Sequence, residues 1–367
     1  MKSIRHFGAA RRALAASVVA CGLAAGLAAG APAAHAGTGC TWAPITLENG
    51  WHSEQGAYDT GNPSVCLEDD GMVYLSGSVA APSGSSNSEF GILPVWDWPT
   101  RNLYFDVYTL NGTYGVLRID TDGTMWAYGG LGGSKGYTSL AGVSYPDAAV
   151  TQTDVTLLNG WQSADSVYTT GDPAFSITSG IVHLSGSLRR PAGSGPQTAA
   201  LLPSQAQPSD NCFYTPTYTF DGGIWNLGIQ TPSGDVFDAL DNRYISMAGI
   251  NYPTAPTAWQ QLNLLAGSSA SLCNTGPASY TSGNVVYLTG LLALPLGFNG
   301  EIAVLPAQAR PSHYLYMIAY NDGPGTSGPD QYVTLRIDPD GSMWIFSPPN
   351  GSAYLMSLAG LSFHLLS

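Results

Sequence analysis

The segment Leu117-Arg118-Ile119-Asp120-Thr121-Asp122-Gly123-Thr124-Met125-Trp126 returns later in the chain as Leu335-Arg336-Ile337-Asp338-Pro339-Asp340-Gly341-Ser342-Met343-Trp344. A diverged copy lies between them, at residues 227–237. Apolar residues alternate up to an Asp or Pro followed by Gly, and a bulky aromatic residue comes after the turn. This pattern is typical of two strands joined by a tight reversal. We therefore interpret the chain as three tandem copies of one module.

Other markers recur in the same order around these hairpins. They are an Asn-Gly-Trp turn (lost in the third copy), a Val-x-Leu-x-Gly strand, a Leu-Pro pair with a second Pro five residues after the first, and a closing Ser-x-Ala-Gly segment with a terminal aromatic residue. The strands alternate between apolar and polar residues, which predicts one buried face. The sequence thus predicts an all-β protein with three tandem antiparallel β-sandwich domains, at residues 37–149, 150–257 and 258–367.

The links between the copies are short, at residues 146–153 and 253–257. Such links permit the three domains to pack around a pseudo-threefold axis, so that one chain forms a pseudo-trimeric monomer. Independent domains arranged as beads on a string are the alternative.

Residues 1–36 have the composition of a secretory signal peptide. Lys2, Arg5, Arg11 and Arg12 precede an Ala/Val/Leu-rich run, and Ala34-His35-Ala36 offers a cleavage site. Arg11 and Arg12 also form a weak twin-arginine signal. No later segment is apolar for long enough to span a bilayer, so we expect an extracellular protein without membrane insertion.

The charge of the processed chain narrows the class of partner. Removing the signal takes away four of the 12 basic residues and none of the 25 acidic ones, which leaves a net charge of −17. Nucleic acid, anionic lipid and phosphate-rich wall polymers would be repelled by this surface. A neutral or cationic partner is expected.

Four cysteines remain after processing, and outside the cell they should pair. Of the three pairings that the sequence allows, we prefer Cys40 with Cys66 and Cys212 with Cys273, because each joins nearest neighbours. None of the spacings is typical of a metal site, so we expect no metal and no cofactor.

The ordered set of motifs resembles the distal receptor-binding module of bacteriophage tail fibres. The family pattern carries Arg before the second Pro of the Leu-Pro motif; only Arg310 keeps it, and Trp98 and Gln207 stand there in the other copies. The resemblance implies a β-sandwich that binds a cell-surface structure, commonly a glycan, without chemistry. The secretion signal and the three copies without a fibrous shaft depart from that family.

The acidic residues are interpreted mainly as structural. Asp120, Asp122, Asp338 and Asp340 fit a calcium loop, but the middle copy keeps Gly234 and loses the carboxylates, which favours a turn. A glycosidase needs a pair of acidic residues at a set separation. We find no such pair that recurs between copies, because the sequence around each of four glutamates differs: Glu54, Glu68, Glu89 and Glu301.

The tryptophans fall into two groups. Trp51, Trp126, Trp161 and Trp344 recur at repeat positions and are predicted to be core. Trp96, Asp97 and Trp98 lie in the proline-bounded loop, where indole rings can stack on a sugar while Asp97, Arg101 and Arg310 bind hydroxyls. The alternative is that these rings cap the sandwich or fill a domain interface.

The sequence therefore predicts a secreted, non-enzymatic, lectin-like binding protein for a neutral surface glycan or cell-wall polysaccharide. A secreted polysaccharide hydrolase is one alternative, and a structural or toxin-delivery subunit that binds proteins is another.

Overall fold

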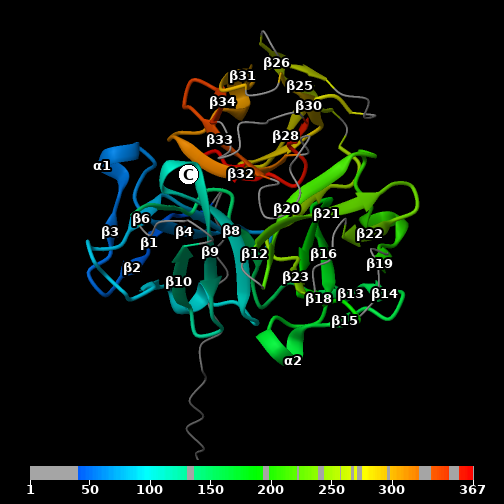
Figure 1. Cartoon of the computed structure of the whole chain (residues 1–367), viewed down its shortest axis with the longest axis horizontal. Helices are drawn as coiled ribbons and strands as arrows, with labels where there is room; N and C mark the ends of the chain where they lie inside the picture. The colour runs from blue at the N-terminus through cyan, green and yellow to red at the C-terminus, as the bar shows by residue number, and fades with distance from the viewer. Residues whose placement is uncertain are drawn as a thin grey trace, which may run out of the picture. The chain divides into compact units, whose positions relative to one another are not determined.

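Each of the three sequence repeats folds into two antiparallel sheets, one of four strands and one of eight. Figure 1 shows the repeats as blue-to-cyan, green and yellow-to-red groups of strands. The computed structural model describes residues 40–129, 136–192, 198–220, 223–238, 244–256, 258–265, 268–270, 275–295, 298–321, 332–346 and 355–366. The predicted signal peptide and Cys273 lie outside these ranges.

Twelve strands, and a 3-10 helix after the seventh strand, follow one another in the same order in each repeat; among the described residues, η2 is found in repeat 1 alone and a short α-helix in repeats 1 and 2. Repeat 1 contains β1 (Ala43–Pro44), β2 (Thr46–Leu47), β3 (His52–Ser53), α1 (Gln55–Tyr58), β4 (Ser64–Leu67), β5 (Met72–Ser76), β6 (Ser78–Ala80), β7 (Glu89–Ile92), η1 (Val95–Asp97), β8 (Leu103–Thr109), η2 (Leu110–Gly112), β9 (Thr113–Ile119), β10 (Thr124–Gly129), β11 (Thr138–Ser139) and β12 (Ser144–Pro146). Repeat 2 contains β13 (Thr153–Asp154), β14 (Thr156–Leu157), β15 (Gln162–Ser163), α2 (Asp165–Tyr168), β16 (Ala174–Thr178), β17 (Ile181–Ser185), β18 (Ser187–Arg189), β19 (Thr198–Leu201), η3 (Ser204–Ala206), β20 (Phe213–Thr219), β21 (Gly223–Gln230), β22 (Asp235–Asp238), β23 (Tyr244–Ser246) and β24 (Asn251–Pro253). Repeat 3 contains β25 (Gln260–Gln261), β26 (Asn263–Leu264), β27 (Ser269–Ala270), β28 (Ala278–Ser282), β29 (Val285–Thr289), β30 (Leu291–Ala293), β31 (Gly300–Val304), η4 (Ala307–Ala309), β32 (Leu315–Asn321), β33 (Tyr332–Ile337), β34 (Ser342–Phe346), β35 (Leu355–Ser357) and β36 (Ser362–His364).

The strand order is identical in the three repeats. In repeat 1 the small sheet runs β1-β4-β5-β12 and the large sheet runs β2-β7-β10-β9-β8-β11-β6-β3. Apolar residues of both sheets meet between them, for example Val73 and Leu75 of β5 with Leu117 and Met125 of the large sheet. Repeats 2 and 3 have separate cores at equivalent positions. The predicted all-β class and the three tandem β domains are confirmed.

The quoted hairpins form as predicted. Strands β9 and β10 pair from Ile119 opposite Met125, and β33 and β34 pair from Ile337 opposite Met343. Asp122 Oδ1 accepts a hydrogen bond from the Thr124 backbone N–H at 3.0 Å, as Asp340 Oδ1 does from Ser342 at 2.9 Å. These carboxylates therefore shape the turn, which is the role that the sequence favoured for them.

The central strands β8, β20 and β32 contact one another pairwise. Each of them carries two tyrosines four residues apart, and the first tyrosine of one repeat packs on the second tyrosine of the next. The ring centroids are 5.9 Å apart for Tyr104 and Tyr218, 5.8 Å for Tyr214 and Tyr320, and 5.1 Å for Tyr316 and Tyr108. The contacts run from repeat 1 to 2, from 2 to 3 and from 3 to 1, so they close a ring.

The closing segment of each repeat makes a second cyclic contact. Gly142, Gly249 and Gly360 have φ angles of +80°, +82° and +78°, which suit glycine. A Cβ atom there would lie 3.0 Å or less from Met317, Phe105 and Thr215 respectively, each in the preceding repeat of the ring. The backbone N–H of Asn102 also donates to the Thr169 carbonyl at 2.8 Å, and that of Tyr314 donates to the Asp59 carbonyl at 3.2 Å. The repeats therefore pack around a pseudo-threefold axis rather than as separate beads.

Candidate functional site

The outward face of the large sheet of repeat 1 carries a row of four side chains in cross-strand register. Glu89 of β7 lies opposite Trp126 of β10, Trp126 lies opposite Arg118 of β9, and Arg118 lies opposite Tyr104 of β8. All four side chains are half-buried. Cross-strand partners on one face lie close enough to act together, so this row, named row 1, is a continuous surface.

Repeat 3 builds the same row from the same residue types. Glu301 of β31 lies opposite Trp344 of β34, Trp344 lies opposite Arg336 of β33, and Arg336 lies opposite Tyr316 of β32. A register shift follows the glutamate pairing in both repeats, so even the local irregularity is repeated. This set is named row 3.

An aspartate fixes the arginine of row 1. Arg118 Nε lies 2.5 Å from Asp120 Oδ1, and Trp126 Nε1 donates to Asp120 Oδ2 at 3.0 Å. The guanidinium carbon lies 5.8 Å from the centroid of the Tyr104 ring and 6.0 Å from that of the Trp126 ring. Asp120 therefore neutralises the arginine and orients the indole, while Arg118 lies between two aromatic rings.

Row 3 holds its arginine through two contacts with one aspartate. Arg336 Nε lies 2.6 Å from Asp338 Oδ1, and Arg336 Nη2 donates to Asp338 Oδ2 at 3.0 Å. Its guanidinium carbon is 5.3 Å from the Trp344 ring and 5.4 Å from the Phe346 ring. Burial is the main cause that raises the pKa of Asp338, and Glu301 adds to it, while Arg336 opposes it. Among the described residues the Trp344 Nε1 atom has no hydrogen-bond partner, in contrast with Trp126.

Repeat 2 keeps the register but not the chemistry. Thr198, Phe237, Gly228 and Tyr214 occupy the four positions, named row 2. A Cβ atom on Gly228 would lie 2.4 Å from Phe237 Cζ, so the phenyl ring lies over the position from which an arginine would extend. The Phe237 ring also reaches Tyr214, at 6.1 Å between centroids. Row 2 is therefore filled by an apolar ring.

Rows 1 and 3 have the chemistry for binding a polyhydroxylated ligand. Half-exposed aromatic rings provide apolar faces, the arginines keep N–H donors beyond those bound to aspartate, and the glutamates offer acceptors. Because each arginine is already paired with a carboxylate, neither row has an excess of positive charge.

The structure separates the residues that the sequence analysis grouped as a sugar site. Trp96 is 56% exposed, whereas Asp97 is 1% exposed. Trp98 Nε1 donates to the Leu93 carbonyl at 2.9 Å, and Arg101 donates to the Asp172 carbonyl of repeat 2 at 3.2 Å. Of the four residues from the loop of repeat 1, Trp96 alone is exposed, while Trp98 and Arg101 are half-buried and Asp97 is buried.

The residue before the second proline of the Leu-Pro motif has the same structural role in each repeat. Trp98, Gln207 and Arg310 each donate a hydrogen bond to the carbonyl of the leucine five residues earlier, at 2.9, 3.3 and 3.4 Å respectively. Each also lies against the glycine of the following hairpin turn, at Gly123, Gly234 or Gly341. Arg310 therefore caps a turn here, although its side chain stays exposed.

Two expectations about repeat positions need correction. Trp51 and Trp161 are buried to 4% exposure, as predicted, but Trp126 and Trp344 lie on the outward face and are not core. Glu89 and Glu301 were expected to have no counterpart in another repeat, yet they occupy equivalent strand positions. Both stand four residues before the Leu of the Leu-Pro motif, which is the sequence signal that identifies them.

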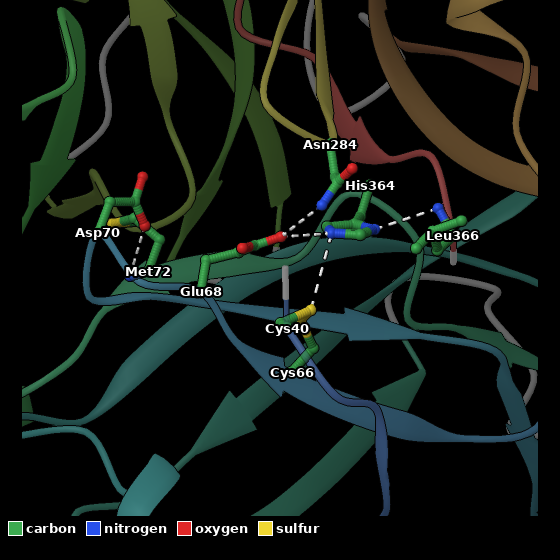
Figure 2. Close-up of a disulfide and its surroundings, with 8 residues drawn as sticks. All are labelled: Cys40, Cys66, Glu68, Asp70, Met72, Asn284, His364 and Leu366. Atoms are coloured by element: carbon green, nitrogen blue, oxygen red, sulfur yellow. Dashed lines mark hydrogen bonds and ion pairs between the residues drawn. A yellow bond between two sulfur atoms is a disulfide. The ribbon is translucent and has the colours of Figure 1, made fainter. Parts of the chain in front are cut away.

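The first predicted disulfide, Cys40 with Cys66, is present, and it lies beside His364 of the C-terminal strand β36 (Figure 2). His364 Nε2 lies 2.7 Å from Glu68 Oε1 and 3.7 Å from Cys40 Sγ, and its Nδ1 accepts the Leu366 N–H at 3.1 Å. With Nδ1 as an acceptor, the neutral ring carries its proton on Nε2 and donates it to Glu68.

Burial is the main cause that lowers the pKa of His364. The side chains of Cys40, Cys66, Glu68 and His364 also lie close enough together for a metal site. However, the two sulfurs are bonded to each other, and His364 Nε2 faces the Glu68 carboxylate. The group thus joins repeat 1 to repeat 3 as a clasp. Because Cys273 lies outside the described residues, the pairing of Cys212 with Cys273 stays a prediction.

In the part of the chain that the structure describes, no helix has both the length and the apolar character needed to cross a membrane. Comparison with known proteins found no matching family model, no matching curated protein and no matching solved structure.

Proposed function

We propose that this chain is a secreted, non-enzymatic binding protein that recognises a neutral surface glycan or cell-wall polysaccharide through rows 1 and 3. The observation that carries the proposal is the recurrence of one Glu-Trp-Arg-Tyr row, in identical cross-strand register, on the outward faces of two repeats. The Glu, Trp and Arg of each row lie outside the core clusters of their repeats, so core packing does not account for these three residue types; the tyrosine of each row also packs at an interface between repeats.

Electrostatics favour an uncharged ligand. The processed chain has a net charge of −17, which repels anionic polymers at long range. At short range the two arginines are neutralised by Asp120 and Asp338. A neutral sugar can stack its apolar face on tryptophan and bond its hydroxyls to arginine and glutamate without displacing either ion pair.

A hydrolase acting at row 3 is the second candidate, and one observation favours it. The pKa of Asp338 is raised, chiefly by burial, and Glu301 contributes to the rise, so row 3 places a carboxyl group with a raised pKa near a second carboxyl group. The bidentate contact with Arg336 argues for a positioning role, because it occupies both oxygens of Asp338.

The test is retention of the signal-free protein on a panel of neutral wall polysaccharides, with Trp126→Ala and Trp344→Ala made singly and together. Each single variant should weaken retention by about tenfold or more, as for a tryptophan at the centre of a binding site, and the double variant should abolish it. Trp96→Ala, which removes an exposed tryptophan outside the rows, is the matched control and should bind as the parent does. Full retention of the double variant would contradict the assignment.

The same incubations distinguish the two candidates. Binding without chemistry releases no new reducing ends from the polysaccharide. Reducing ends that appear with the parent and disappear with Asp338→Asn would establish the hydrolase instead.

A further inference from the structure

The three rows occupy the same strand positions but differ in composition. Rows 1 and 3 keep the arginine, whereas in row 2 the Phe237 ring takes its place. Arg118 and Arg336 each lie between a tryptophan and a tyrosine in cross-strand register, but at the equivalent place Gly228 has no side chain. The Phe237 ring covers Gly228 closely and extends to Tyr214, so it takes the volume of the missing arginine. Gln230, which is exposed, stands where Asp120 and Asp338 clasp the arginine in the other rows.

We infer that the chain is a two-site binder whose partner is a polymeric glycan that engages rows 1 and 3 together, while row 2 is silent. This inference rests on the proposed function. Two rows of the same composition recognise the same chemical unit, and only a polymer or a densely covered surface offers that unit twice to one chain.

The cyclic contacts between repeats support joint engagement. Tyr104 packs on Tyr218 of repeat 2, and Tyr316 packs on Tyr108 of repeat 1, so the inner end of row 1 and that of row 3 each belong to an interface between repeats. The clasp of Glu68 and His364 further fixes repeat 3 against repeat 1. Two sites held by packed interfaces bind a multivalent ligand with a high effective concentration, which raises apparent affinity by roughly 10² to 10⁴ over one site.

The valence is tested by titration of the signal-free full chain with a short oligosaccharide cut from the neutral polysaccharide that retains it. Two equivalents should bind per chain, and one in Trp126→Ala or in Trp344→Ala. The intact polysaccharide should bind at least about 100-fold more tightly than the oligosaccharide, and this gain should vanish in either single variant. One or three equivalents for the parent would overturn the inference, while retention of the parent on the neutral polysaccharide would still support glycan binding.

Exchanging the rows tests the silent site directly. Gly228→Arg, Gln230→Asp and Phe237→Trp, made together, should raise the number of equivalents from two to three. The reciprocal change in repeat 1, Arg118→Gly, Asp120→Gln and Trp126→Phe, should lower it from two to one. Thermal unfolding checks that each variant is folded, and the reciprocal variant decides the matter if the first fails to fold.

The outcomes separate the two proposals. If the reciprocal variant keeps two equivalents, the inference is wrong although glycan binding is real. If no neutral polysaccharide retains the parent chain, both the proposed function and the inference fail.

Discussion

Repeats 1 and 3 differ from repeat 2 on one face of the sandwich and resemble it on the other. Toward the core, all three keep the same strand order and bury equivalent apolar residues. On the outward face, repeats 1 and 3 keep a Glu-Trp-Arg-Tyr row that repeat 2 has replaced by Thr198, Phe237, Gly228 and Tyr214. The inner face thus fixes the fold in every copy, and the outer face is free to carry or to lose a site.

The largest expected effect is on stability, and it distinguishes a core tryptophan from a tryptophan on the outward face. Trp161→Ala should destabilise the protein by about 3–5 kcal/mol, because it empties a core position. Trp126→Ala removes a ring from the outer face and should cost about 1 kcal/mol or less. Urea denaturation of both variants measures the difference; equal losses would break the distinction between core and row tryptophans.

The second effect concerns His183, which stands in repeat 2 where Tyr74 and Tyr287 stand in the others. Burial lowers the pKa of His183 to about 3, and neither ring nitrogen has a partner among the described residues. An unfolded histidine titrates near pH 6.5, so below that pH the unfolded chain binds a proton that the folded chain does not. Stability should therefore fall as the pH falls from about 6.5 toward 3.

The loss from His183 amounts to roughly 2–3 kcal/mol between pH 6.5 and 4.5. His183→Leu should remove this part of the pH dependence in denaturation curves. The account of repeat 2 is wrong if the parent and the variant lose stability in parallel over that interval.

A third effect tests the filling of row 2. Gly228→Ala places a Cβ atom 2.4 Å from the Phe237 ring and should destabilise the protein by about 1–3 kcal/mol. In a Phe237→Ala background the same change should cost little, because the ring is gone. A double-mutant cycle measures the coupling, and additive effects would show that Phe237 does not occupy the place of the arginine.

The smallest effect lies in the hairpin turns. Backbone hydrogen bonds lower the pKa of Asp122 and of Asp340, whereas repeat 2 has Ser233 at this position. The two carboxylates therefore stabilise the folded protein fully above their pKa in the unfolded chain, near 3.9. This stabilisation is lost as the pH falls through their lower pKa in the folded protein. Asp122→Asn with Asp340→Asn should reduce acid sensitivity below pH 4, and Ser233→Ala should leave it unchanged. An unchanged acid transition in the double variant would show that the turn carboxylates do not contribute to acid sensitivity.

The repeat architecture was predictable from sequence because it rests on local signals. The alternation in β5, the Asp-Gly turns and the paired prolines each specify backbone geometry within a few residues, and they recur in order. The pseudo-threefold packing was permitted by the short links, but the tyrosine pairs that produce it join positions more than 100 residues apart, as Tyr104 and Tyr218 do.

The candidate site was not predictable in the same way. Recurrence of Trp126 and Trp344 indicated a constrained position, and constraint alone does not distinguish a core residue from a surface residue. The bulge beside Trp126 interrupts the register with β7, so simple alternation does not give the pairing with Glu89. The loop residues Trp96, Asp97 and Trp98 were grouped because they adjoin in sequence, but the turn of η1 sends their side chains into different environments.

Oxidative footprinting of the tryptophans, with and without the neutral polysaccharide that retains the protein, tests the central claim most directly. The account predicts that the polysaccharide protects Trp126 and Trp344 together and leaves Trp96 as reactive as before. Protection of Trp96 with no change at Trp126 and Trp344 would contradict it.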